Sequence, residues 1–300
     1  MNAPAGYRWK VLVTGATGFI GRNLVEQFSP RYQVLAPGRE ELNLLDPVAV
    51  RDYLELHRCD AIIHAATERS NRALGAAPDL LGRNCRMFFN LARNRHAFGR
   101  MLFLSSGAVY DRACVPPSVT EDQFDARVPS EDYGFSKYVC AKSLRADEEI
   151  YELRLFAVFG PHEDWRVRFI SNACCRAVWD LPVIIRQNVV FDYLDVTDLA
   201  GILEHFLTGT FRYRHYNVTT GRPVDLKTLA AEVIEASGKP LEIVVRKEGL
   251  AAEYTGSNRR LMAEIPGFQF RERRDSIQRL YAWYASRKTD LDLKLLRFDE

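Results

Sequence analysis

Several signals that would set this chain apart from ordinary globular proteins are missing from its 300 residues. No apolar run approaches the roughly 20 residues that a membrane span needs, and residues 1–10 lack the apolar core of a secretory signal peptide. The chain also lacks an excess of charge of either sign. Its 41 Lys and Arg against 39 Asp and Glu leave a formal net charge of +2, and the sequence contains no basic run. We therefore expect a cytoplasmic protein without a membrane partner and without nucleic acid as its main partner.

Paired cysteines are also absent. The six cysteines contain no C-x-x-C spacing, so we expect free thiols in a reducing compartment and no metal site. The neighbours Cys174 and Cys175 leave a redox role open, although core packing is the simpler interpretation. With 47% hydrophobic residues, a chain of this length can bury a large core without such links.

The first half of the chain alternates between strand-like and helix-like segments. Short apolar runs predict strands at 11–13, 33–36, 61–66, 101–104 and 153–156. Helical spacing and capping residues predict helices at 20–28, 47–56, 84–98 and 134–150. Because continuous apolar strands alternate with helices, the sequence predicts an α/β fold, a Rossmann-type doubly wound parallel sheet covered on both faces.

After Gly160-Pro161 the elements become shorter and more mixed. Residues 183–185 and 189–191 flank Gln187-Asn188 and predict a β-hairpin. Further segments predict strands at 216–218 and 241–245 and helices at 195–207, 225–236 and 276–286. We expect a dinucleotide-binding domain at 1–159 and a smaller mixed α/β substrate lobe at 160–300, interleaved because segments near 189–220 return to the first domain.

A glycine-rich turn joins the first predicted strand to the first helix. The run Thr14-Gly15-Ala16-Thr17-Gly18-Phe19-Ile20-Gly21 has the spacing G-x-x-G-x-x-G. Gly15 permits the tight turn, Gly18 lets the backbone approach a pyrophosphate, and Gly21 allows close packing of helix on strand. The helix N-terminus then favours an anion, so this segment predicts a dinucleotide site.

The residue that reads the adenosine ribose is expected at the end of the second strand, where an acidic residue favours NAD. This chain has Gly38-Arg39-Glu40-Glu41 there, with no acid at the strand end itself. The planar fork of Arg39 matches the oxygens of a 2′-phosphate and favours NADP. An exposed Arg39, or Glu40 turned toward the ribose of NAD, remains the alternative.

A candidate catalytic set follows the fourth predicted strand. Ser106 lies at the carboxyl edge of the sheet, and Tyr133 and Lys137 are spaced i, i+4 at the start of a helix. A nearby ammonium stabilises a tyrosinate and makes tyrosine a usable acid or base. Tyr138 and Lys142 have the same spacing, but they start more than a turn further from the sheet edge, so we assign the role to Tyr133.

Together these segments resemble the extended short-chain dehydrogenase/reductase family, the NAD(P)-dependent nucleotide-sugar epimerases, dehydratases and reductases. The resemblance covers most of the chain and is carried by residues 14–21, 63–66, 105–110, 133–137, 153–161 and 192–198. It implies Ser106, Tyr133 and Lys137 as catalytic residues and a homodimer through the helices starting near Asn84 and Gly134. Around the cofactor it implies Gly15, Thr17, Gly18, Phe19, Ile20, Gly21, Leu45, Asp46, Ala65, Ala66, Thr67 and Asn84. Asp46 and Asn84 also suit plain helix caps.

Within that family, residues 38–46 and 160–164 look most like GDP-fucose synthases and related 4-keto-sugar reductases. Ala108 stands at what looks like the position of the extra cysteine that those synthases use to epimerise, which favours reduction alone. Ala157 and Phe191 replace an Asn and an Arg that usually touch substrate. Substitute anion ligands, each of which also suits a solvated surface position, are Arg166, Arg168, Arg186 and Arg222.

The leading hypothesis is an NADP-dependent reductase of a nucleotide-linked 4-keto-6-deoxy sugar, with hydride from NADPH and a proton from Tyr133. The alternative is an NAD-dependent nucleotide-sugar epimerase on the same scaffold. A non-catalytic, cofactor-sensing protein is a less favoured third, because the Ser106, Tyr133 and Lys137 set is intact.

Overall fold

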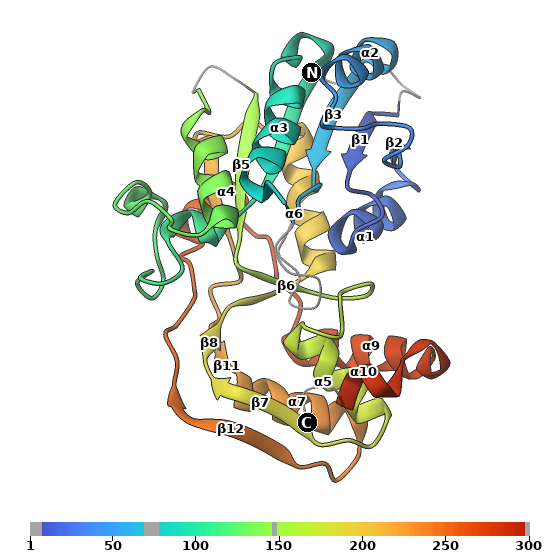
Figure 1. The fold of residues 1–300 in the computed structure, drawn as a ribbon, viewed down its shortest axis with the longest axis vertical. Coiled ribbons are helices and arrows are strands. Elements are labelled where there is room, and N and C mark those ends of the chain that lie inside the picture. Colours follow the sequence, from blue (N-terminus) through green and yellow to red (C-terminus); the bar gives the residue numbers. More distant parts are fainter. Residues whose placement is uncertain (1–7, 69–77, 146–148, 298–300) are drawn as a thin grey trace.

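The computed structural model describes residues 8–68, 78–145 and 149–297. Its centre is a six-stranded sheet in the order β10-β5-β4-β3-β1-β2, with every neighbouring pair parallel (Figure 1). The strands are β1 (Lys10–Thr14), β2 (Gln33–Leu35), β3 (Cys59–His64), β4 (Phe98–Ser106), β5 (Ile150–Leu155) and β10 (His215–Val218). This arrangement confirms the predicted doubly wound parallel sheet, whose strand order reverses between β1 and β3.

Helices cover both faces of this sheet (Figure 1). One face packs against α1 (Phe19–Phe28) and α6 (Val196–Thr208), and the other against α2 (Pro47–His57), α3 (Leu80–Ala92) and α4 (Asp132–Lys142). Successive strand residues point to opposite faces. Accordingly Val11 and Val13 belong to the core under α1 and α6, while Leu12 belongs to the core on the other side.

Two helix boundaries differ from the sequence prediction. Helix α3 begins at Leu80 because Asp79 caps it, accepting a hydrogen bond from the Gly82 amide at 3.2 Å. Helix α4 ends at Lys142 rather than 150, and the Ser143 hydroxyl donates to the Cys140 carbonyl at its end. Residues 146–148 of the predicted helix lie outside the described part of the chain. The predicted α2 is confirmed, with Asp46 as its cap.

Several of the elements after residue 160 form a second core. It contains α5 (Phe169–Val178), α7 (Leu226–Ser237), α9 (Arg273–Ala285) and α10 (Leu293–Arg297), packed with β7 (Val183–Asn188). The predicted hairpin is wrong. Strand β7 pairs in parallel with β12 (Ile243–Leu250), and β8 (Val190–Phe191) pairs with β11 (Val224–Asp225). The apolar alternation of β7 reflects burial of Val183 and Ile185 under the helices, which does not reveal the partner strand.

The remaining elements connect the two cores. Strand β6 (Ala157–Phe159) pairs in parallel with β9 (Tyr193–Asp195), and α6 and β10 then rejoin the central sheet. The short pieces are α8 (Arg259–Glu264), η1 (Arg95–Ala97), η2 (Gly107–Tyr110), η3 (Glu121–Gln123) and η4 (Lys288–Asp290). Among the described residues, no helix is both long and apolar enough to cross a bilayer. The expectation for the N-terminal segment concerns residues 1–10, of which residues 1–7 lie outside the described part.

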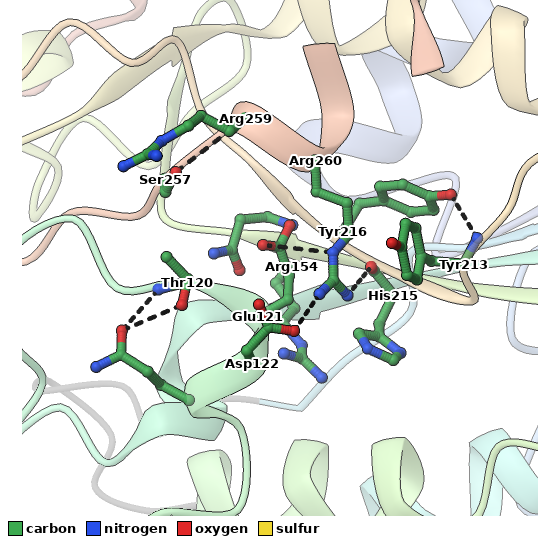
Figure 2. Close-up of polar contacts among 12 residues, drawn as sticks. Thr120, Glu121, Asp122, Arg154, Tyr213, His215, Tyr216, Ser257, Arg259 and Arg260 are labelled. Atoms are coloured by element: carbon green, nitrogen blue, oxygen red, sulfur yellow. Dashed lines mark hydrogen bonds and ion pairs between the residues drawn. The ribbon is translucent and has the colours of Figure 1, made fainter. Parts of the chain in front are cut away.

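A buried polar network holds the segment that follows β4. The Arg154 guanidinium on β5 donates to Glu152 at 2.9 Å and to the Tyr110 hydroxyl at 2.7 Å, and that hydroxyl donates to Asn217 on β10. Burial raises the pKa of Tyr110 to about 12, so the phenol keeps its proton. Nearby, Arg260 contacts Asp122 at 2.6 Å and the His215 carbonyl at 3.5 Å (Figure 2).

His64 ties the ends of β1 and β3 together. Its Nδ1 lies 2.8 Å from the Thr14 hydroxyl, and its ring stacks on Phe103 with centroids 5.7 Å apart. The side chain is buried, and burial, followed by the Lys137 charge, lowers the pKa of His64 to about 3. His64 is therefore neutral in the folded protein, and its Nδ1 shares one hydrogen bond with the Thr14 hydroxyl.

We predict that His64 makes the protein acid-sensitive. Unfolded His64 takes up a proton near pH 6.5 but folded His64 does so only near pH 3, so stability present above pH 6.5 is lost as the pH falls. At pH 5 the loss from this one residue is roughly 2 kcal/mol. Urea unfolding of wild type and His64→Asn at pH 7 and pH 5 measures it. Equal losses of unfolding free energy in both proteins would contradict the assignment.

Candidate functional site

Three backbone segments meet at the glycine turn without room for side chains. Gly15 has φ +70°, and a Cβ there would lie 2.7 Å from the Ala66 Cα at the exit of β3. A Cβ on Gly21 would lie 2.1 Å from the Gly15 carbonyl oxygen. The turn, the first turn of α1 and the Ala65-Ala66 segment therefore pack backbone against backbone at the point where the strand order reverses.

The same turn presents an anion-binding helix end. Gly18 precedes α1 and supplies no side-chain cap, and the first turn of α1 contains no acidic residue. Thr17 and Gly18 are exposed, while Phe19 and Ile20 are partly buried. Uncapped amides and the helix dipole favour a phosphate at such an end. The residues present thus fit the pyrophosphate of a dinucleotide.

The three predicted catalytic residues lie around the carboxyl end of β4. Lys137 is 3% exposed, and its ammonium donates to the Leu104 carbonyl at 3.2 Å, two residues before Ser106. It also lies 5.8 Å from the centroid of the Tyr133 ring. The Ser106 hydroxyl accepts a hydrogen bond from the Ala108 amide at 3.2 Å. The arrangement places a cation beside a phenol at the end of the strand that carries the serine.

The start of α4 is pressed against the backbone that follows Ser106. The Glu131 carboxylate caps the helix, accepting from the Tyr133 amide at 3.0 Å and the Gly134 amide at 2.8 Å. A Cβ at Gly134 would lie 2.7 Å from the Ala108 carbonyl oxygen. Glycine at 134 therefore lets the helix approach η2 and sets the position of Tyr133.

The second Tyr-x-x-x-Lys pair has a different partner. The Tyr138 hydroxyl donates to Asp125, and the Lys142 ammonium pairs with the same carboxylate at 2.7 Å. The hydrogen bond from Lys142, followed by that from the Tyr138 phenol, lowers the pKa of Asp125, and the hydrogen bond to Asp125 raises the pKa of Tyr138. Tyr138 and Lys142 thus fasten the 121–125 region to α4.

Asn84 joins the exit of β3 to α4. Its side chain brackets residue 68, with Oδ1 accepting from the Glu68 amide at 2.8 Å and Nδ2 donating to the Glu68 carbonyl at 3.1 Å. Thr67 donates to Oδ1 at 3.4 Å, and Nδ2 lies 3.4 Å from the Ser136 hydroxyl. Asn84 lies inside α3 rather than capping it, and it holds the loop that follows Ala66.

The segment after β2 places Arg39 opposite this loop. Arg39 Nη2 lies 3.3 Å from Glu68 Oε1, and Arg83 on α3 donates to the same oxygen at 2.8 Å. The structure therefore adds Glu68 and Arg83, which the sequence analysis missed.

Further along, the Asp46 carboxylate accepts from the Val48 amide at 2.9 Å and the Ala49 amide at 3.2 Å, and the Leu45 amide donates to the Asn43 side chain. Asp46 thus has its cap role, and a contact of Leu45 or Asp46 with adenine stays a prediction.

The four predicted substrate arginines are dispersed. Arg166 forms a bidentate pair with Asp164 at 2.7 and 2.9 Å, and Arg222 pairs with Glu272 at 3.1 Å. Arg168 precedes α5, and Arg186 is exposed on β7. Arg222 also lines a cavity of about 120 Å³ with Tyr193, Asp195 and Arg271, remote in sequence from the catalytic set. Binding of substrate by these residues stays a prediction.

The sequence pattern of the NAD dependent epimerase/dehydratase family matches residues 11–219. The chain belongs to this family. Its members include NAD(P)-dependent enzymes of the extended short-chain dehydrogenase/reductase type, which agrees with the resemblance noted from the motifs. The match includes the glycine turn, the Ser106 strand, and the Tyr133 helix.

Curated relatives match over part of their length. GDP-L-colitose synthase of Yersinia pseudotuberculosis is 29% identical over 44% of this chain and 46% of its own. Methionine adenosyltransferase 2 subunit beta of Rattus norvegicus is 32% identical over 38% of this chain and 36% of its own. This chain thus spans less than half the length of these two relatives.

Solved structures match over nearly the whole chain. A GDP-mannoheptose C4 reductase from Campylobacter jejuni with NADP bound has a TM-score of 0.77 at 17% identity, covering 92% of this chain and 98% of that one. A GDP-L-fucose synthetase from Naegleria fowleri bound to NADP has a TM-score of 0.78 at 17% identity, covering 93% and 94%. At these identities the likeness shows the fold.

We predict that the contact between Gly21 and Gly15 carries much of the stability of this region. Gly21→Ala places a methyl group against the Gly15 carbonyl and should lower the free energy of unfolding by about 1–3 kcal/mol. Gly38→Ala is the matched control, since a Cβ at Gly38 meets no atom within 4 Å. Chemical denaturation measures both variants, and equal stability of the two would contradict the packing argument.

Proposed function

We propose that the protein is an NADP-dependent reductase of a nucleotide-linked 4-keto-6-deoxy sugar. The observation that carries this proposal is the buried Lys137 ammonium, held at the Leu104 carbonyl and 5.8 Å from the Tyr133 ring centroid. Family membership, and names of relatives and structural neighbours that include GDP-sugar synthases and reductases, support the same class of reaction.

The catalytic roles follow from elementary electrostatics. A bound nicotinamide coenzyme would supply the hydride for the ketone carbon. Tyr133 would give its proton to the ketone oxygen, because the neighbouring Lys137 charge stabilises the resulting phenolate. Ser106 would donate a hydrogen bond to the same oxygen. Residues 15–21 would hold the pyrophosphate on the α1 N-terminus, and Arg39 would hold the 2′-phosphate of NADP.

Two features favour reduction over epimerisation. Ala108 follows Ser106 closely on η2 and is 1% exposed, so this position offers no acid or base. Arg39 rather than an acid faces the loop after β3, which suits a reaction that consumes NADPH as a substrate. The alternative remains an NAD-dependent nucleotide-sugar epimerase, in keeping with the family name.

We also propose a homodimer through α3 and α4 and a cytoplasmic location.

A cofactor-sensing protein without turnover is a third possibility, since methionine adenosyltransferase 2 subunit beta is among the relatives. That name describes a subunit of an assembly. The Ser106, Tyr133 and Lys137 arrangement favours an enzyme instead, because a sensor has no need of a buried ammonium beside a phenol.

The function is tested by two measurements on the same protein. A thermal-shift screen of NADP(H) and NAD(H) against UDP, GDP, CDP and dTDP should reveal the nucleotide, because a ligand of the native state raises the melting temperature. A 4-keto-6-deoxy sugar linked to that nucleotide should then cause net oxidation of NADPH at 340 nm. Interconversion of sugars without net cofactor change would identify an epimerase, and binding without either reaction would identify a sensor.

Tyr133→Phe should lower turnover by about 10²- to 10⁴-fold, because the variant lacks the proton donor. NADPH binding should persist, since the lost hydroxyl is not part of the glycine turn. Tyr138→Phe is the matched control on the same helix and should keep most activity, because its hydroxyl contacts Asp125. Loss of turnover in Tyr138→Phe with activity retained in Tyr133→Phe would reverse the assignment.

A further inference from the structure

Two arginines from different segments converge on one carboxylate oxygen. Glu68 Oε1 accepts from Arg83 Nη2 at 2.8 Å and from Arg83 Nε at 3.3 Å, and it lies 3.3 Å from Arg39 Nη2. Arg39 follows β2, Glu68 follows β3, and Arg83 lies in the first turn of α3. The group therefore bridges three elements on the carboxyl side of the sheet.

The carboxylate is carried on a fixed backbone. Both hydrogen bonds of Asn84 to residue 68 hold the main chain, so the Glu68 side chain can rotate without disturbing the loop. The Glu68 and Arg83 side chains are 29% and 27% exposed, whereas Arg39 is 65% exposed. Solvent, and a ligand, can therefore reach the group from the side of Arg39.

The position of the group matches one part of a dinucleotide. Ala66, two residues before Glu68, packs on Gly15 of the phosphate-binding turn. The ribose next to the adenine is read at the end of the second strand of such sheets, where Arg39 lies. Glu68 thus lies two residues from the backbone that packs on the turn proposed for the pyrophosphate, and it contacts both Arg83 and the residue proposed for the ribose 2′ position.

The charges also suit a phosphate. One carboxylate facing two guanidinium groups leaves one positive charge unmatched. A phosphate monoester carries about −1.5 to −2 charges near pH 7 and three acceptor oxygens, enough for both planar arginine forks. A carboxylate and a phosphate repel each other, so both cannot take the same donors at once.

We propose that Arg83 is a second ligand of the NADP 2′-phosphate beside Arg39, and that Glu68 is an internal counter-ion which this phosphate displaces. The inference rests on the proposed use of NADP. In the free protein Glu68 holds both arginines in place. When NADP binds, the arginines exchange the carboxylate for the phosphate and Glu68 turns toward solvent, whereas NAD brings no group that displaces it.

Binding constants of wild type, Arg83→Met, Arg39→Ala and Glu68→Gln test this proposal, measured by calorimetry with NADPH, NADH, 2′,5′-ADP and 5′-AMP. Arg83→Met should weaken NADPH and 2′,5′-ADP about tenfold, the loss of one hydrogen bond to a charged group, and leave NADH and 5′-AMP unchanged. Glu68→Gln should strengthen NADPH binding about threefold, since the competing ion pair is partly open to solvent and contributes little free energy.

Arg86→Met is the matched control, because Arg86 is exposed on the same helix three residues further along. It should bind all four ligands like wild type, and thermal unfolding should show that every variant is folded. Unchanged NADPH binding by Arg83→Met, with weaker binding by Arg39→Ala, would overturn this inference and leave the proposed function standing. Weaker NADH binding by Glu68→Gln would show that Glu68 reads ribose hydroxyls, also overturning it. Wild type that binds no dinucleotide would end both.

Discussion

Backbone contact at the strand reversal is the constraint from which the remaining site geometry follows. Gly15 meets the Ala66 backbone, and Gly21 meets the Gly15 carbonyl, at distances that no side chain would allow. These contacts place the α1 N-terminus, the end of β1 and the loop after β3 around one point. Because β4 is the next strand of the same parallel sheet, Ser106 and the Lys137 ammonium face the same edge.

Most of the central sheet could be predicted from the sequence because each buried strand is a continuous apolar run. Val11–Val13 and Ala61–Ile63 are fully buried, so their composition records burial on both faces. Strand β7 shows the limit of this signal. Its partner β12 lies 60 residues further along, with Ile243 opposite Val183, and pairing over such a separation leaves no local pattern. The starts of α3 and α4 depend on the N-caps Asp79 and Glu131, and other acidic or polar residues nearby in the sequence could equally serve as caps.

In the candidate site, too, the sequence predicts contacts between residues that are close along the chain and misses contacts that only the fold creates. The spacing of Tyr133 and Lys137 predicts their proximity, since residues four apart share a helix face. The Leu104 carbonyl that holds Lys137 is a backbone group, which any residue has, so the sequence does not reveal this contact. Glu68 and Arg83 are ordinary charged residues in the sequence, and only the fold brings them to Arg39. The sequence indicates a role for Arg83 only through its position next to Asn84, a predicted site residue.

The network around Arg154 has a consequence for how the chain can be divided. Arg154 is buried on β5, yet its partner Tyr110 bonds to Asn217, and Glu121 accepts from the Asn217 amide at 2.8 Å. A fragment ending before β10 would lack Asn217 and would leave Arg154 and its hydrogen-bond partners beside an edge of the sheet that has lost its last strand. Residues 8–159 therefore share buried hydrogen bonds with β10, and we expect chimaeras that join relatives at residue 160 to need the Asn217 segment together with the first half.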